Sequence, residues 1–327
     1  MRDHIHLWPE VTRALKRGRP VVALESAVLS HGVPADTAWG LAARLDQTVR
    51  AHGATPALVA VKNGRIEVGA SLGDITYLLD RSALKVAERD LAVAVAQGKS
   101  GGTTVAATLA VATRAGIAVM ATGGIGGVHL DAPEDVSGDL YALSRHPVVV
   151  VCAGAKIICD QRRTIEALDT LGVTVVGYQT DTYPAFVVRS SGIPLTHRVE
   201  AAAQIAAIAR ARVVLGAPGA LLVVQPPPEE VALERETVDA ALAEALERAR
   251  AAGVGGPALT PFLLAALADA TGGRSLIANL QLLESNAGLA AEIATALAAG
   301  PRGGTRRRRP DLTARRERRA AKGSGRR

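Results

Sequence analysis

The sequence of 327 residues has few aromatic residues and only two cysteines. Aromatic side chains make up 2% of the chain, so the core must consist of small aliphatic side chains at close backbone spacing. Cys152 and Cys159 are seven residues apart in one apolar stretch. A disulfide framework or a zinc site would need more ligands and a different spacing. We therefore expect reduced thiols, as in a cytoplasmic protein.

Long apolar segments are also missing. The N-terminal residues MRDHIHLWPEV contain no apolar signal core. No apolar run approaches the roughly 18 residues that a membrane span requires. With 48% apolar and 21% charged residues, the chain can still bury a substantial core. These features predict a soluble, cytoplasmic, globular protein without membrane contact.

The net charge of +7 is concentrated in one segment. Residues 301–327 contain 12 basic and two acidic residues, whereas residues 1–300 contain 26 basic and 29 acidic residues. The Arg-rich tail lacks apolar periodicity and repels itself, so we expect it to be disordered. Residues 1–300 show no Pro/Ser-rich linker and are predicted to form one domain. Nucleic-acid contact is conceivable only through the tail, because the rest of the chain is mildly acidic.

Apolar strand-like runs alternate with amphipathic helical stretches, and the last part of the chain is helical. Such alternation predicts an α/β fold with a mostly parallel central sheet, helices on both faces and a helical C-terminal part. In these sheets ligands bind at the carboxyl ends of the strands. The expected strands are residues 20–27, 57–62, 66–68, 117–122, 147–153, 173–177 and 220–224. The expected helices are residues 34–52, 104–115, 159–171, 229–252, 261–270 and 275–299.

Two charged residues lie where buried strands should end. Glu25 follows an apolar run, and burial raises the pKa of a carboxyl group, which suits a general acid. The alternative is a Glu that binds a neighbouring loop. Lys156 follows PVVVVCAGA, where desolvation would free its amine for nucleophilic attack. Only six of the 38 basic residues are Lys, so a retained Lys indicates a role that Arg cannot fill, although a lysine extending to solvent is equally compatible.

Other polar or glycine-rich segments have two interpretations each. The glycines at 101–102 and 123–127 favour either phosphate binding or tight turns. Asp135, Ser137 and Asp139 suit a Mg²⁺ or Mn²⁺ site, or helix capping. Asn279 and Asn286 share one face of a late helix, where they either contact a base edge or bond within the core.

Together these segments resemble the pseudouridine-5'-phosphate glycosidases, also called indigoidine synthase A-like proteins. The resemblance covers residues 5 to 298 with the order of the motifs kept. The matching runs are ALESAVLSHGVP (23–34), KVAERDL (85–91), GGTTVAAT (101–108), ATGGIGGVH (121–129), VVVCAGAKIICDQRRTIEALDTLGVTVVGYQTDTYPAF (149–186), SSGIPLTHRV (190–199) and TPFLLAALADATGGRSLIANLQLLESNAGLAAEIA (260–294).

The resemblance implies an α/β/α sandwich, a homotrimer and a specific reaction. The C–C glycosidic bond of pseudouridine 5'-phosphate is cleaved reversibly to uracil and ribose 5-phosphate. By the same resemblance Glu25 is the proton donor and Lys156 is the nucleophile that holds the ring-opened ribose. Asp135 is the Mn²⁺ ligand, and the remaining substrate contacts are Lys85, Val105, Ser137, Gly138, Asp139 and Asn279.

Two features depart from the family pattern. The LDAPE loop at 130–134 is short and lacks the usual Arg-Gly after His129, and DVSGD replaces DISAD.

Two other functions remain compatible with the residues. A Schiff-base aldolase for a sugar phosphate would use the same lysine, and a nucleic-acid binder would use the tail.

Overall fold

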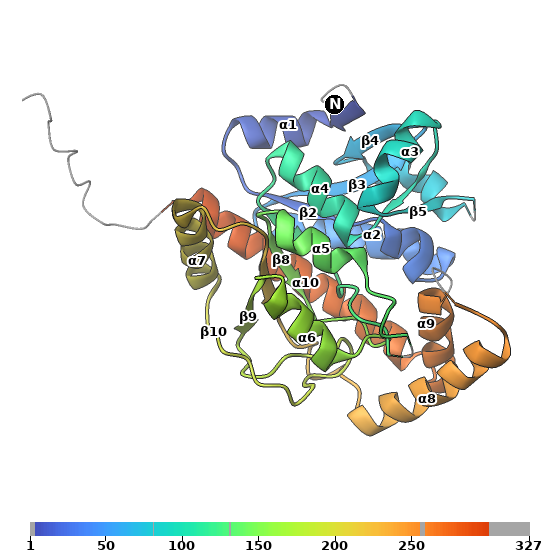
Figure 1. Cartoon of the computed structure of the whole chain (residues 1–327). Coiled ribbons are helices and arrows are strands. Elements are labelled where there is room, and N and C mark those ends of the chain that lie inside the picture. Colours follow the sequence, from blue (N-terminus) through green and yellow to red (C-terminus); the bar gives the residue numbers. More distant parts are fainter. Residues whose placement is uncertain (1–3, 81, 131, 256–258, 301–327) are drawn as a thin grey trace, which may run out of the picture.

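The computed structural model of the chain describes residues 4–80, 82–130, 132–255 and 259–300 (Figure 1). The Arg-rich tail, for which the sequence predicts disorder, lies outside the described residues. None of the helices in these four ranges has both the length and the apolar sequence of a transmembrane segment.

One twisted sheet runs through the described ranges. The strands follow the order β1-β4-β3-β2-β7-β8-β11-β9-β10, and β6 connects β5 to β3. All pairs are parallel except β3 with β4 and β3 with β6. The strands are β1 (Ile5–Leu7), β2 (Val21–Leu24), β3 (Thr55–Lys62), β4 (Arg65–Val68), β5 (Leu84–Val86), β6 (Gly101–Thr103), β7 (Val119–Ala121), β8 (Val149–Cys152), β9 (Thr174–Tyr178), β10 (Arg198–Val199) and β11 (Leu221–Val224).

Helices cover both faces of the sheet (Figure 1). On one face α10 packs against β2, β7 and β8 and lies beside α2 and α7, while α4, α5 and α6 pack together on the other face. The helices are α1 (Pro9–Lys16), α2 (Ala35–Ala51), α3 (Leu91–Ala96), α4 (Val105–Ala115), α5 (Gly138–Arg145), α6 (Gln161–Thr170), α7 (Ala202–Leu215), α8 (Arg235–Ala251), α9 (Leu259–Ala270) and α10 (Arg274–Ala298), with short turns η2 (Val28–Gly32), η3 (Leu72–Leu79) and η4 (Glu88–Asp90).

The core is made of small aliphatic side chains, as the composition predicts. All four residues of each of β2, β8 and β11 are buried, because helices cover both faces of these strands. On α10 the buried residues are rich in Ala, and the helix packs against β2, β7 and β8. These small residues let the helix axis approach the strands closely.

The predicted α/β/α architecture is confirmed, and each expected strand and helix is present with shifted ends. The segments that the sequence did not indicate are short or unusual. The glycines at 101–102 were expected in a phosphate-binding segment or a tight turn, yet Gly101–Thr103 forms strand β6. α7 was missed because its apolar residues form no stripe along one face. In the structure Val213, Val214 and Leu215 at its end are 78%, 85% and 80% exposed.

Candidate active site

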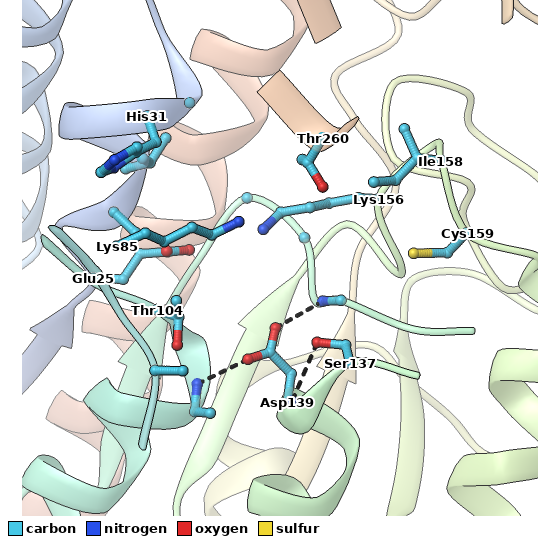
Figure 2. Close-up of a pocket in the computed structure, with 18 of the residues that line it drawn as sticks. Glu25, His31, Lys85, Thr104, Ser137, Asp139, Lys156, Ile158, Cys159 and Thr260 are labelled. Atoms are coloured by element: carbon cyan, nitrogen blue, oxygen red, sulfur yellow. Dashed lines mark hydrogen bonds between the residues drawn. The ribbon is translucent and has the colours of Figure 1, made fainter. Parts of the chain in front are cut away.

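A cavity of about 290 Å³ lies at the carboxyl ends of β2, β7 and β8. The parallel arrangement of these strands brings the residues that follow them to one edge of the sheet. Figure 2 shows the side chains of this cavity. Of the residues predicted from the sequence, those lining it are Glu25, Lys85, Asp135, Ser137, Gly138, Asp139, Lys156 and Asn279.

Glu25 directly follows β2, and its side chain is almost completely buried, with 6% exposed. The hydroxyl of Thr122, the first residue after β7, donates a hydrogen bond to Oε1 of Glu25. Burial raises the pKa of the Glu25 carboxyl, while the Lys156 ammonium and the Thr122 hydroxyl partly oppose this rise. A carboxyl group that retains its proton above the usual range can serve as a general acid.

Lys156 lies on the loop that follows β8 and is half-buried. Its backbone N–H donates to the carbonyl of Ile125, at 2.9 Å, so this loop is attached to the glycine-rich loop after β7. The side chain extends into the cavity towards Lys85 and lies near Glu25 (Figure 2). The acid and nucleophile predicted from the sequence therefore share one cavity.

Lys85 enters the cavity from the opposite side, on the short strand β5. Burial lowers the pKa of its ammonium, and the neighbouring Lys156 lowers it further, whereas Asp139 and Glu25 act in the opposite direction. Two lysine side chains therefore face one space. Their N–H groups are donors of the kind that bind an anionic ligand such as a phosphate.

Cys159 also lines the cavity and is the other side chain to consider as a nucleophile. It is a free thiol with 2% exposure. Burial raises the pKa of Cys159 to about 12, so the reactive thiolate is scarce near neutral pH. This electrostatic environment favours Lys156 as the attacking group.

The carboxylate of Asp139 is buried and connects two elements of the cavity wall. Its Oδ1 accepts from the N–H of Ala106 at the start of α4, and its Oδ2 accepts from the N–H of Gly126, both at 2.9 Å. A Cβ on Gly126 would lie 2.2 Å from Oγ of Ser137, so this approach requires glycine. The glycine-rich loop thus donates this N–H to a protein carboxylate.

Ser137 has the helix-capping role that the sequence left open. It is the N-cap of α5, where its Oγ accepts from the N–H of Asp139 at 3.2 Å. Gly138 begins the helix, and nothing lies within 4 Å of a Cβ placed on it. The two residues present an open polar surface to the cavity.

Replacing Asp139 by Asn should destabilise the fold. Asn has one carbonyl oxygen, so only one of the two N–H groups keeps its acceptor and the other faces an NH₂ donor. We expect a loss of about 1–3 kcal/mol in the free energy of unfolding, measured by urea denaturation. Asp160→Asn is a matched control, since Asn caps α6 as well as Asp does. An equal loss in both variants would contradict this role of Asp139.

Asp135 lies at the rim of the cavity, with 46% of its side chain exposed. Its Oδ2 is 3.1 Å from Nδ1 of His129, close enough for an ion pair but not aligned for a hydrogen bond. Within the described ranges, no three His, Cys, Asp or Glu side chains converge on one point. One accessible carboxylate fits a hard cation that keeps water or phosphate oxygens as further ligands.

Two predicted residues occupy different positions relative to the cavity. The Val105 side chain is fully buried at the start of α4, and its neighbours Thr104 and Ala106 line the cavity instead. Asn279 of α10 lines the cavity and is 6% exposed. Asn286, on the same face, is completely buried and bonds within the core.

Some residues of the site were not predicted from the sequence. Thr122 does not line the cavity but bonds Glu25, and it could have been found by the argument applied to Glu25, because it is a polar residue directly after a buried strand. His31 of η2 lines the cavity beside Lys85, and its Nδ1 is 2.7 Å from Oγ of Ser30. Phe186 and Thr260 come from distant segments without a local signal.

Comparison with known proteins gives matches along most of the chain. Residues 10–296 match the family described as indigoidine synthase A like protein. A pseudouridine-5'-phosphate glycosidase of Methylobacterium nodulans is 49% identical over 303 residues, covering 90% of this chain and 90% of the relative. A pseudouridine-5'-phosphate glycosidase of Gemmatimonas aurantiaca is 50% identical over 291 residues, covering 89% and 95%.

Solved structures are similar in fold. The prealnumycin C-glycosynthase AlnA in complex with ribulose 5-phosphate has a TM-score of 0.83 and 38% identity, covering 90% of this chain and 97% of that chain. An indigoidine synthase A-like protein from Thermotoga maritima has a TM-score of 0.83 and 36% identity, covering 90% and 96%. The family match includes every candidate residue of the cavity.

Proposed function

Because the chain belongs to the indigoidine synthase A-like family, we propose that it cleaves the C–C glycosidic bond of pseudouridine 5'-phosphate reversibly. The products are uracil and ribose 5-phosphate. The names of the relatives support this activity, and AlnA was solved with a pentulose 5-phosphate. The observation that carries the proposal is the shared cavity of Lys156 and Glu25.

In the proposed reaction the side-chain nitrogen of Lys156 attacks C1' of the ribose. The C1'–O4' bond opens and O4' takes up the proton that the attacking nitrogen loses, which leaves a secondary amine that joins Lys156 to an open-chain sugar. An ordinary pair of carboxylates would not suffice, because the bond to be broken ends at carbon rather than at a leaving-group oxygen. The nitrogen provides the electron pair that this bond cleavage needs.

Glu25 supplies the proton for the second step. The nitrogen lone pair forms a C=N bond as the C1'–C5 bond breaks, and C5 of uracil takes the proton from Glu25. Water then hydrolyses the C=N bond, which releases ribose 5-phosphate and frees Lys156. The raised pKa of Glu25, caused by its burial, favours the protonated form that this step requires.

The remaining cavity residues suit the two ends of the substrate. Lys85 and the polar groups of Ser137 and Gly138 would hold the 5'-phosphate. Asn279 would hydrogen-bond an edge of uracil, since its amide both donates and accepts. Two free, buried thiols also suit the cytoplasm, where the proposed reaction would take place.

The test is an ultraviolet assay of uracil release from pseudouridine 5'-phosphate in the presence of Mn²⁺. A Schiff-base aldolase acting on the same sugar phosphate would instead produce carbonyl fragments and no uracil. Formation of pseudouridine 5'-phosphate from uracil and ribose 5-phosphate tests reversibility. Absence of uracil under both metal-free and Mn²⁺ conditions would reject the proposed activity.

We propose Asp135 as the ligand of a Mn²⁺ ion that would contribute positive charge near the phosphate. Asp135→Asn weakens a carboxylate ligand, so the Mn²⁺ concentration for half-maximal activity should rise at least about tenfold. Isothermal titration with Mn²⁺ alone gives a second readout. Glu134→Gln, an exposed neighbour, is the control. An unchanged Mn²⁺ affinity in Asp135→Asn would place the metal elsewhere.

We also propose that the chain forms a homotrimer. Three consecutive apolar side chains at the end of α7, Val213 to Leu215, are at least 78% exposed, which is unusual for a free surface. Sedimentation equilibrium should give three times the mass of 33.7 kDa. Val214→Glu would bury a charge in the interface and should shift the protein towards monomers. A wild-type monomer at micromolar concentration would contradict this proposal.

A further inference from the structure

A buried hydrogen-bond network lies behind the cavity and is centred on Asn286. This residue is on α10 and has no exposed surface. Its Nδ2 donates to the carbonyl oxygen of Thr122 at 2.9 Å and to that of Gly123 at 3.3 Å. Both carbonyls belong to the turn where β7 leads into the glycine-rich loop.

The other side of the Asn286 amide is bonded as well. Its Oδ1 accepts from Nε2 of Gln225, the residue after β11, at 3.1 Å, and Gln225 also donates to Oγ of Ser285 at 2.7 Å. The backbone N–H of Gln225 in turn donates to the carbonyl of Cys152 at the end of β8. This set of partners fixes the orientation of the Asn286 amide. Exchanging its oxygen and nitrogen would place its NH₂ against Nε2 of Gln225 and its oxygen against the two backbone carbonyl oxygens.

Thr122 connects this network to Glu25. Its carbonyl is held by Asn286, its N–H donates to Val151 at 3.0 Å, and its hydroxyl donates to Oε1 of Glu25. The backbone of Thr122 therefore has little freedom to turn. The position of the hydroxyl follows from these contacts.

The Thr122 hydroxyl has one proton, and it is donated to Oε1 of Glu25. The acidic proton of Glu25 then belongs on Oε2. The charged groups that face Glu25 are Lys156 after β8, Lys85 on β5 and Asp139 on α5, and His31 of η2 lies beside Lys85. Among the described residues none of these groups hydrogen-bonds Glu25, whose side-chain partner is Thr122.

We propose that Asn286 is a positioning residue that acts on Glu25 through Thr122. By holding the turn after β7, it keeps the Thr122 hydroxyl on one carboxyl oxygen and leaves the proton on the other. The role of Glu25 as the acid rests on the proposed function. The positioning of the Glu25 carboxyl by Asn286 and Thr122 does not depend on that function. The sequence allowed Asn286 either to contact a base edge or to bond within the core. In this proposal it bonds within the core and from there controls which oxygen of Glu25 carries the proton.

The first test is independent of activity. The full chain is labelled with ¹³C at the Glu side-chain carboxyls, and the Glu25 signal is assigned by its loss in Glu25→Gln. Thr122→Val keeps the shape but removes the donor, so the titration midpoint of Glu25 should rise by about one pH unit. The direction follows because the Thr122 hydrogen bond favours the charged carboxylate. Thr122→Ser, which keeps the hydroxyl, should titrate like wild type.

Asn286→Leu tests the proposed link itself. It should shift the Glu25 midpoint in the same direction as Thr122→Val, and the double variant should titrate like Thr122→Val alone, since both act through one hydroxyl. Thr108→Val is a matched control, because this Thr is also fully buried but its hydroxyl bonds to Thr103 and not to Glu25. It should leave the Glu25 midpoint unchanged.

Kinetics of uracil release provide the second readout. Since the protonated acid is required, activity falls as the pH rises through the pKa of Glu25, and this alkaline limb should move to higher pH in Thr122→Val and Asn286→Leu. At a pH where Glu25 is protonated in every variant, any loss of activity from a misplaced acid proton should appear in kcat rather than in KM. An unmoved midpoint in Thr122→Val, or additive shifts in the double variant, overturns the proposal. If the wild type releases no uracil, the proposed function fails while the titration still decides the positioning role.

Discussion

Lys156→Ala should abolish uracil release, with a loss of about four orders of magnitude or more. The reason is that the alanine variant has no electron pair with which to form the C=N bond, and Cys159 cannot replace it because burial raises the pKa of that thiol to about 12. The measurement is a single-turnover assay at enzyme excess. Circular dichroism and the thermal midpoint should remain near the wild-type values, because Lys156 lies at the cavity and not in the core.

Lys99→Ala is the matched control for this prediction. Lys99 is exposed and outside the cavity lining, so the variant should keep wild-type turnover. Borohydride reduction during turnover should attach a sugar phosphate to Lys156, which peptide mass spectrometry can locate. Normal turnover in Lys156→Ala, or trapping at Lys85 instead, would show that the assigned nucleophile is wrong.

Glu25→Gln should lower kcat by about two to four orders of magnitude. Glutamine keeps the shape of the side chain and can still accept from the Thr122 hydroxyl, but it has no acidic proton to give to C5 of uracil. Attack by Lys156 does not need this proton, so the secondary-amine adduct that still carries uracil should accumulate. Mass spectrometry of the intact protein should detect this adduct without borohydride, because it contains no C=N bond to reduce. Unchanged kcat with no accumulated adduct would remove Glu25 from the acid role.

The same variant has a consequence for stability. The pKa of Glu25 is raised in the folded state by burial, so between the ordinary Glu pKa and this raised value the folded state binds more protons than the unfolded chain. Stability contributed by Glu25 is therefore present at low pH and is lost as the pH rises through this window. Denaturation at a series of pH values should show a flatter profile for Glu25→Gln, and an identical profile would contradict the shift.

Much of the candidate site could be predicted because it depends on local sequence. Glu25 directly follows β2 and Lys156 lies on the loop just after β8, and parallel strands bring such positions to one edge. The family expected from the motifs is confirmed over residues 10–296. For the catalytic and ligand roles, the structure provides positions, and the roles themselves stay predictions.

Other features could not be predicted from local sequence. The spacing of Asn279 and Asn286 places them on one helix face, but the neighbours of each depend on how α10 lies across the sheet. The same is true of the glycines at 123–127, whose N–H groups could equally have faced a phosphate or the Asp139 carboxylate.

The sequence alone determined the alternation of strands and helices, the small-residue core and the strand ends where chemistry is possible, because periodicity and burial preference are properties of neighbouring residues. Only the tertiary structure decided that Lys85 from β5 faces Lys156 from the loop after β8, and that Thr122 bonds Glu25. These pairs join segments far apart in the chain. Their contacts depend on strand order and helix packing, which local patterns leave open.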